Sequence, residues 1–182
     1  MLESSTLLLL PWAGGRQRRG GGSGTVPAPT REIRNADTTR LLGFACRRLG
    51  RPGAWFSWLA RPALDVYERE EEDTSLLFTL YCPWFWTRVW EVYDADEHLI
   101  GTLRGDLVLD SIGRILATVE GGAGTGGFHF RGQAGYGPTS LTQAEVGVRM
   151  TFAPEVAGDP FAKMMLLAAG LALTNGQRAE KT

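Results

Sequence analysis

The sequence predicts a mainly β domain, an antiparallel barrel or sandwich, wrapped around one apolar helix near the C-terminal end of the chain. Two observations support this fold class. From Trp55 to Phe152, apolar and polar residues alternate in short runs separated by turn residues. After them, residues 161–173 contain a single charge, Lys163. A helix that is apolar on all sides must lie inside a protein or in lipid, so this segment decides how the strands pack.

The expected helix spans residues 160–173. Asp159 is a good N-terminal cap, and Pro160 has the backbone angle of a first helical residue. At about 1.5 Å per residue the apolar run is roughly 20 Å long, short of the roughly 30 Å hydrocarbon core of a membrane. We therefore expect the domain to enclose this helix and a polar tail to follow at 176–182. The residues expected to form the helix core are Phe161, Met164, Met165, Leu167, Ala168 and Leu171.

Before the helix, the chain divides into an expected arm at 1–36 and a domain at 37–175. Residues 13–31 are rich in Gly, Arg and Pro, and they offer too little apolar surface to offset the entropy of ordering. We expect this segment to be disordered. Residues 38–49 fit two structures, because their apolar positions match either a short amphipathic helix or the first strand of the domain.

The remaining segments alternate with a period of two residues, as strands do. Charged or glycine-rich turns separate these segments, and such spacing is typical of an antiparallel meander. In chain order, the expected strand segments are 64–68, 76–82, 84–93, 99–104, 107–109, 115–119, 128–130 and 146–152.

Charge is distributed unevenly along this chain of 182 residues, although its formal net charge is only −1. Residues 1–61 hold ten arginines and three acids, giving +7, whereas residues 62–182 hold nine Lys or Arg and seventeen acids, giving −8. A basic arm beside an acidic domain indicates an anionic partner for the arm. The alternative interpretation is that arginine-rich tails are common in proteins from high-GC genomes.

The cysteine content favours a reducing compartment. Cys46 and Cys82 have neither the spacing of a metal site nor the number of a disulfide framework. The apolar run Leu7–Leu10 is too short for a secretory signal, and arginines follow it rather than precede it. We expect a cytoplasmic monomer without a membrane-spanning segment. Any contact with a membrane is expected to be peripheral.

The sharpest local signal is the tryptophan-rich segment around residues 84–90. In a strand, Trp84, Trp86, Arg88 and Trp90 share one face. If that face is exposed, its tryptophans suit the headgroup region of a membrane, and Arg88 suits a phosphate or a cation–π contact. The alternative is that these tryptophans line the core or cover one end of a barrel.

Three other motifs have ordinary structural interpretations. Gly122–Gly127 matches G-x-G-x-x-G, but a strand rather than a helix is expected after it, so we interpret it as a hairpin loop. Asp94–Asp96 begins like a calcium loop but lacks the later glycine and glutamate of such a loop. Glu70–Asp73 is expected to be a solvated hairpin tip.

No pair of His98, His129, Cys46 and Cys82 has a spacing that indicates a catalytic or metal site. We therefore predict no catalytic residue, no metal site and no cofactor, and a function that is not enzymatic.

The order of several segments resembles the phospholipid scramblase family and the related LURP-one-like and tubby-like proteins. The resemblance covers roughly residues 40–175, and it implies a closed antiparallel barrel of twelve strands around the C-terminal helix. Scramblases also carry a cysteine-rich stretch and an acidic calcium segment, which this chain lacks, so calcium-stimulated scrambling is not expected. The segments that carry the resemblance are Leu64–Tyr67, Leu76–Leu80, Trp90–Asp94, Ile100–Leu103, Asp110–Ala117, Phe152–Pro154 and Asp159–Lys163.

These observations favour a scramblase-like domain that associates peripherally with anionic phospholipid membranes. Its expected lipid contacts are the tryptophan-rich segment together with Arg40, Arg47 and Arg48. The alternative is an interaction module, similar to tubby-like proteins, whose basic arm binds nucleic acid or an acidic protein.

Overall fold

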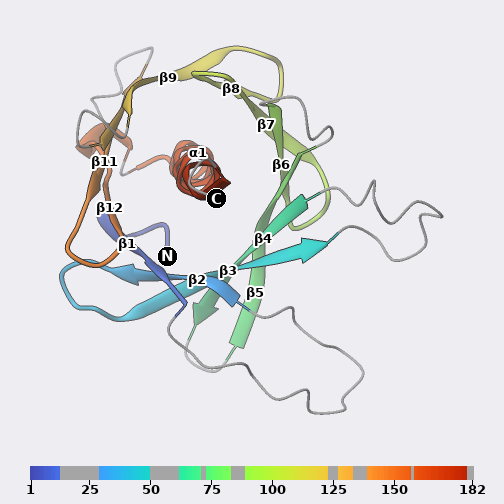
Figure 1. Ribbon diagram of the computed structural model, residues 1–182. Helices are drawn as coiled ribbons and strands as arrows, with labels where there is room; N and C mark the ends of the chain where they lie inside the picture. Colours follow the sequence, from blue (N-terminus) through green and yellow to red (C-terminus); the bar gives the residue numbers. More distant parts are fainter. Residues whose placement is uncertain are drawn as a thin grey trace.

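Twelve strands form one closed antiparallel barrel, and the helix α1 (Pro160–Ala179) runs through its middle (Figure 1). This arrangement, seen in a computed structural model, confirms the predicted fold class. The residues that the structure describes are 1–12, 29–49, 62–70, 73–82, 89–122, 127–132, 139–156 and 158–179. The strands are β1 (Thr6–Pro11), β2 (Pro29–Asn35), β3 (Leu41–Leu49), β4 (Pro62–Glu70), β5 (Asp73–Tyr81), β6 (Val89–Asp94), β7 (Leu99–Arg104), β8 (Leu107–Asp110), β9 (Ile115–Gly122), β10 (Gly127–Gly132), β11 (Thr139–Gln143) and β12 (Val148–Thr151).

The barrel is a meander in which every strand pairs with its neighbours in the sequence. The seam is the pairing of β1 with β12, in which Leu7 lies opposite Met150 and Leu9 opposite Val148. Closure matters because an open sheet would leave two edge strands with unpaired backbone groups. A short 3-10 helix, η3 (Pro154–Val156), then leads from β12 into α1.

The core consists of α1 and the inward-facing residues of the strands around it. Met165, Leu167, Ala168 and Leu171 have no exposed surface, whereas Phe161 and Met164 are half-buried and pack against the same core. The strand side chains of this core are Leu7, Leu9, Ile33, Ala45, Leu64, Val66, Phe78, Leu80, Val92, Leu103, Val108, Ala117, Phe130, Leu141 and Met150.

The helix lies very close to the wall at β7. A Cβ added to Gly101 would lie 2.4 Å from both the carbonyl oxygen of Leu109 and the terminal methyl of Met165. Only glycine fits there without displacing backbone, because a gap of that size excludes any carbon atom.

The prediction of an arm at residues 1–36 is wrong for its two ends. Thr6–Pro11 and Pro29–Asn35 are strands of the barrel, and their backbone pairing supplies the stability that their composition does not indicate. The rest of that segment, residues 13–28, lies outside the described residues. Of the two structures expected for residues 38–49, the strand is the one that forms, although it is the third strand and not the first.

The helix also continues beyond its predicted end at residue 173, because the described part of the expected polar tail, 176–179, is helical. Thr174, the residue after the apolar run, is still buried, so the barrel encloses the helix at least that far.

Candidate functional site

The two ends of the barrel carry different segments of the chain. Consecutive strands are antiparallel neighbours, so their connections fall alternately at one end and at the other. The connections that follow the odd-numbered strands β1 to β11 share one end. The last two turns of α1 lie at this end, because Nη2 of Arg31, near the start of β2, donates to the carbonyl of Thr174 over 3.0 Å. The helix begins at the opposite end, where η3 leads into it.

The end at which α1 finishes carries exposed arginines. Arg47 and Arg48 lie near the last residue of β3, and Arg104 is the last residue of β7. We call this the basic end and define it by these three arginines. Three described carboxylates accompany these arginines: Asp65, whose Oδ2 lies 3.1 Å from Nε of Arg48, and Asp106 and Glu145, each in a turn of this end.

Three long connections join strands at the basic end and extend its charge in the sequence. They are residues 13–28, 50–61 and 83–88, and they lie outside the described residues. Together they contain six arginines, four tryptophans and no acidic residue. The cations that the sequence analysis found mostly before residue 62 therefore belong largely to segments that enter and leave the barrel at one end.

The opposite end is acidic. Its turns and the start of η3 present Asp37, Asp73, Asp96, Glu97 and Glu155, which are all exposed. We call it the acidic end and define it by these five residues. Arginines occur there as well, and one of them is Arg114, whose Nε lies 2.7 Å from Asp110 Oδ2.

The structure separates three arginines that the sequence analysis treated as one contact. Arg40 lies at the acidic end, immediately before β3, whereas Arg47 and Arg48 lie near the other end of the same strand. At about 3.3 Å per residue, seven residues of strand span roughly 23 Å. One surface at either end of the barrel therefore cannot use all three, and the expected lipid contacts of Arg40, Arg47 and Arg48 stay predictions.

The tryptophan-rich segment is described only at Trp90. This side chain is half-buried and packs against the core, which fits the alternative interpretation of a tryptophan that lines the barrel. Trp84, Trp86 and Arg88 lie outside the described residues, and their expected membrane contact stays a prediction.

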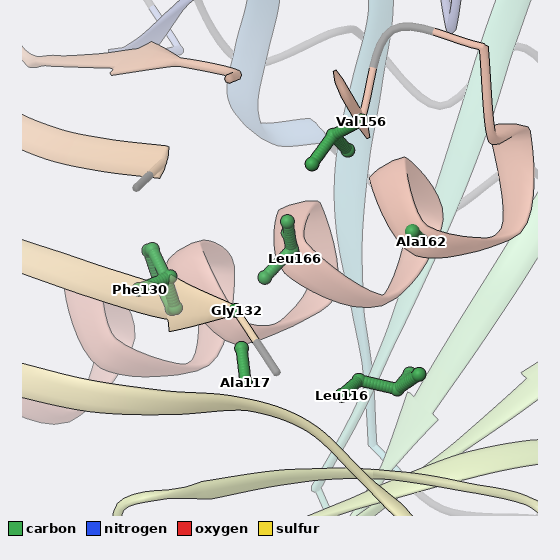
Figure 2. Close-up of a pocket in the computed structure, with 7 residues that line it drawn as sticks. All are labelled: Leu116, Ala117, Phe130, Gly132, Val156, Ala162 and Leu166. Carbon is green, nitrogen blue, oxygen red and sulfur yellow. The ribbon is translucent and has the colours of Figure 1, made fainter. Parts of the chain in front are cut away.

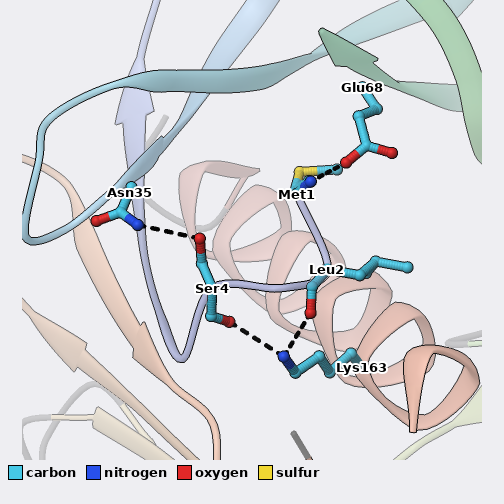
Figure 3. Close-up of polar contacts among 6 residues, drawn as sticks. All are labelled: Met1, Leu2, Ser4, Asn35, Glu68 and Lys163. Atoms are coloured by element: carbon cyan, nitrogen blue, oxygen red, sulfur yellow. Dashed lines mark hydrogen bonds and ion pairs between the residues drawn. The ribbon is translucent and has the colours of Figure 1, made fainter. Parts of the chain in front are cut away.

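A buried polar group closes the acidic end. Lys163, in the first turn of α1, is 1% exposed, and its Nζ donates to the carbonyls of Leu2 and Ser4, the latter over 3.2 Å (Figure 3). Its ammonium also lies 5.6 Å from the centre of the Phe152 ring. Burial lowers the pKa of Lys163 because it disfavours the charged amine.

Two further contacts hold the residues before β1, which we call the N-terminal strap (residues 1–5). Asn35 Nδ2 donates to Ser4 Oγ over 3.0 Å, and the amino group of Met1 pairs with Glu68 (Figure 3). With the two carbonyls on Lys163, these contacts tie the strap to β2, β4 and α1. One feature of the sequence pointed to this cluster, namely the isolated charge at position 163.

A row of polar groups lies on the outer wall of the barrel. Asp65, only 4% exposed, accepts a hydrogen bond from Thr79 Oγ1 over 2.9 Å, and Nε of Arg48 lies 3.1 Å from its other oxygen. Cys46 lies directly opposite Asp65 across β3 and β4. Burial, and then the charge of Asp65, raise the pKa of Cys46 to about 11. The thiol thus stays protonated at neutral pH, which makes it a poor nucleophile.

The turn between β6 and β7 brings Asp94, Asp96 and His98 together, with one ligand atom of each within 4.8 Å of the others. Asp94 has a structural role there, because its Oδ1 accepts the backbone N–H groups of Asp96 and His98 over 3.0 and 2.8 Å. The hydrogen bond from the His98 backbone lowers the pKa of Asp94. These bonds account for the cluster as a stabilised turn, as the sequence analysis expected.

The interior offers little room for a small molecule in the described part of the chain. A cavity of about 10 Å³ lies between α1 and the wall, bounded by Leu116, Phe130 and Leu166 with four other small or apolar residues of β9, β10, η3 and α1 (Figure 2). This volume accommodates about one water molecule at most, and the walls offer it few polar partners. The helix occupies the space that a ligand would need.

Comparison with known proteins gives no assignment. No family model matches the chain, and no curated protein and no solved structure matches it. Among the described residues, no helix has both the length and the apolar character needed to cross a bilayer.

Proposed function

We propose that this protein is a non-enzymatic, scramblase-like barrel that associates peripherally, as a monomer, with membranes that contain anionic phospholipid. One observation carries the proposal, namely the segregation of charge between the two barrel ends. The described basic end exposes Arg47, Arg48 and Arg104 together with Asp106 and Glu145. The acidic end exposes its five defining carboxylates together with three arginines, so the described residues give an excess of positive charge at one end and of negative charge at the other. An anionic surface attracts each nearby arginine by about 1 kcal/mol.

The three long connections at the basic end support the same proposal. In sequence they add arginines and tryptophans without adding a carboxylate. Tryptophan favours the headgroup region of a bilayer, where its ring is shielded from water and its N–H keeps a polar partner. Cys46 and Cys82 are buried thiols, which suits the reducing cytoplasm, and the cytoplasmic leaflet is the anionic one.

Co-sedimentation with vesicles tests the proposal. The full chain is mixed with vesicles of phosphatidylcholine alone, or of phosphatidylcholine with phosphatidylserine, at increasing salt concentrations. We expect binding to the anionic vesicles only, with most of it lost as the Debye length falls from about 10 Å at 0.1 M to about 3 Å at 1 M salt. Any fraction that resists salt measures the tryptophan contribution.

Equal binding to both kinds of vesicle, or to neither, would contradict the proposal. A parallel titration with duplex DNA separates it from the alternative of a nucleic-acid module, because a basic end attracts any polyanion. Salt-dependent DNA binding without vesicle binding would favour that alternative.

A further inference from the structure

We propose that the barrel docks end-on, with the basic end against the anionic lipid surface, the barrel axis near the membrane normal and the acidic end in solution. This inference rests on the proposed function and adds the docked orientation and the side chains that set it. The described contact surface consists of Arg47, Arg104 and the turn that carries Val146. Two carboxylates, Asp106 and Glu145, lie on the same surface, so Arg47 and the arginines of the long connections supply its excess positive charge.

The length of the barrel makes the two ends electrostatically independent. α1 has 20 residues and runs from the acidic end to the basic end, which corresponds to roughly 30 Å. The Debye length at physiological ionic strength is about 8 Å. When the basic end touches the lipid, the carboxylates of the other end lie several Debye lengths away and oppose binding very little. Any tilt that lowers the acidic end brings Asp96 and Glu97 toward like charge.

The side wall offers less to an anionic surface than the basic end does. Two of its described arginines pair with carboxylates: Arg34 Nε lies 2.7 Å from Glu32, and Arg131 Nη1 lies 3.4 Å from Glu120. Such pairs present little net charge, so a side-on orientation gains little attraction. The basic end combines exposed arginines with an exposed apolar side chain.

Two exposed apolar residues mark the two ends and make the orientation measurable. Val146, in the turn between β11 and β12, is 64% exposed at the basic end, and Ile112, in the turn between β8 and β9, is 73% exposed at the acidic end. Both lie on short turns of the barrel, so a label at either position reports where that end lies.

The experiment compares Val146→Cys with Ile112→Cys, each labelled with a polarity-sensitive fluorophore and added to the phosphatidylserine vesicles. Unsubstituted protein treated with the same reagent controls for labelling of the buried Cys46 and Cys82. We expect a blue shift, and quenching by nitroxide-bearing lipid, for the label at 146 and neither change for the label at 112. Co-sedimentation of both labelled proteins is measured in the same samples.

Charge reversal gives a second, independent measurement. Arg47→Glu and Arg40→Glu make the same change at exposed positions near opposite ends of β3. We expect Arg47→Glu to weaken binding to anionic vesicles by roughly tenfold or more, since it replaces an attraction with a repulsion. Arg40→Glu should change the affinity less than twofold.

The outcomes separate this inference from the proposed function. If the protein co-sediments with the vesicles, any label response other than a response at 146 alone would overturn end-on docking. Equal weakening of binding by the two arginine variants would overturn it as well. Either result would leave membrane association standing. Absence of co-sedimentation by the unlabelled protein would overturn both.

Discussion

The two ends of the barrel hold α1 in different ways, and each uses a buried cation. At the acidic end, the Lys163 amine is part of the helix and reaches out to carbonyls of the N-terminal strap. At the basic end, Arg31 is part of the wall and reaches in to the carbonyl of Thr174. Arginine remains charged under all these conditions and spreads its charge over a planar group, whereas a buried lysine responds by a fall in pKa. The acidic end is therefore the one whose stability should depend on pH.

The connections between strands also differ between the two ends of the barrel. At the acidic end, the side-chain oxygens of Asn35, Asp94 and Asp110 accept hydrogen bonds from nearby backbone N–H groups and so fix three hairpin turns. At the basic end, the connections that follow β1, β3 and β5 are longer than those that follow β7, β9 and β11. Long connections are where binding functions commonly occur.

Of the changes predicted here, removal of the seam between β1 and β12 should destabilise the barrel most. Deleting residues 1–11 removes the N-terminal strap and β1, exposes the edges of β2 and β12, and deprives the core of Leu7 and Leu9. We expect loss of cooperative thermal unfolding, measured by circular dichroism. The sequence alone had indicated an arm outside the domain at residues 1–36, and β1 and β2, which both lie within that range, reverse that expectation.

A control variant limits the effect to the strands. Replacing Arg16, Arg18 and Arg19 by Ser changes only the connection between β1 and β2, so we expect its melting temperature to match that of the unsubstituted chain. A truncated chain that still melts cooperatively would show that β1 is not needed to close the barrel.

A charge buried in the core of α1 should also prevent stable folding, because both ends of the barrel are held by contacts with this helix. Leu167 has no exposed surface, and Leu167→Asp would place a carboxylate among apolar side chains. We expect a loss of more than about 4 kcal/mol, seen as insoluble or non-cooperatively unfolding protein. Ile112→Asp makes a similar change at an exposed position and should stay within about 0.5 kcal/mol of the original stability. A soluble Leu167→Asp protein with a near-original melting temperature would contradict burial of α1.

The sequence predicted the parts of this fold that have a periodic signal. The alternation of Phe78, Leu80 and Cys82 correctly placed the buried face of β5, and the apolar run after Pro160 correctly placed the helix in the core. β1 and β2 gave no such signal. Leu7–Leu10 is an unbroken apolar run, and β2 has only Ile33 as a buried aliphatic side chain, so pairing with neighbours far along the chain decides their structure.

The candidate site was less predictable, for a geometric reason. Arg40 and Arg47 are seven residues apart, and they fall on one side of the molecule or on opposite ends according to whether the chain between them is helical or extended. The partners of Lys163 come from residues 1–5, more than 150 positions away. Neither relation has a local signature, because tertiary pairing alone creates it.

Lys163→Met should show how much the buried amine at the acidic end makes the stability of the protein depend on pH. Met keeps the volume but leaves the carbonyls of Leu2 and Ser4 without their donor, a loss of about 1–3 kcal/mol that is partly offset by removal of a buried charge. The pKa of Lys163 in the folded protein lies below its ordinary value of 10.5. At pH values between the folded and the ordinary pKa, the unfolded chain therefore binds more protons than the folded one. The unsubstituted protein thus gains stability as pH rises through this range.

The measurement is urea unfolding of both proteins from neutral pH to about pH 10, the ordinary range of lysine titration. The stability difference, unsubstituted minus Lys163→Met, should grow with pH. The thiol of Cys46 and the phenol of Tyr93 have raised pKa values, and because both proteins contain them their effect cancels in the difference. A difference that is constant, or that shrinks as pH rises, would show that the buried amine does not titrate in this range.

The smallest expected effect lies within the acidic end, where two turns share one design. Asp94 and Asp110 accept the N–H groups two and four residues ahead at matching distances, and each turn places its fourth residue in the left-handed region. That residue is Gly113 in one turn, with φ of 82°, and Glu97 in the other, with φ of 63°. In the left-handed region, a residue with a side chain is strained by about 1–2 kcal/mol relative to glycine. Glycine in turn loses more conformational entropy on folding, which costs about 0.5–1 kcal/mol. The difference predicts that Glu97→Gly stabilises the protein by about 0.5–1 kcal/mol. Gly113→Ala, with open space around the new Cβ, should destabilise it by a similar amount through backbone strain alone. Urea midpoints that move in these opposite directions would show that the turn is limited by φ; a destabilised Glu97→Gly protein would show instead that the Glu97 side chain supports the turn.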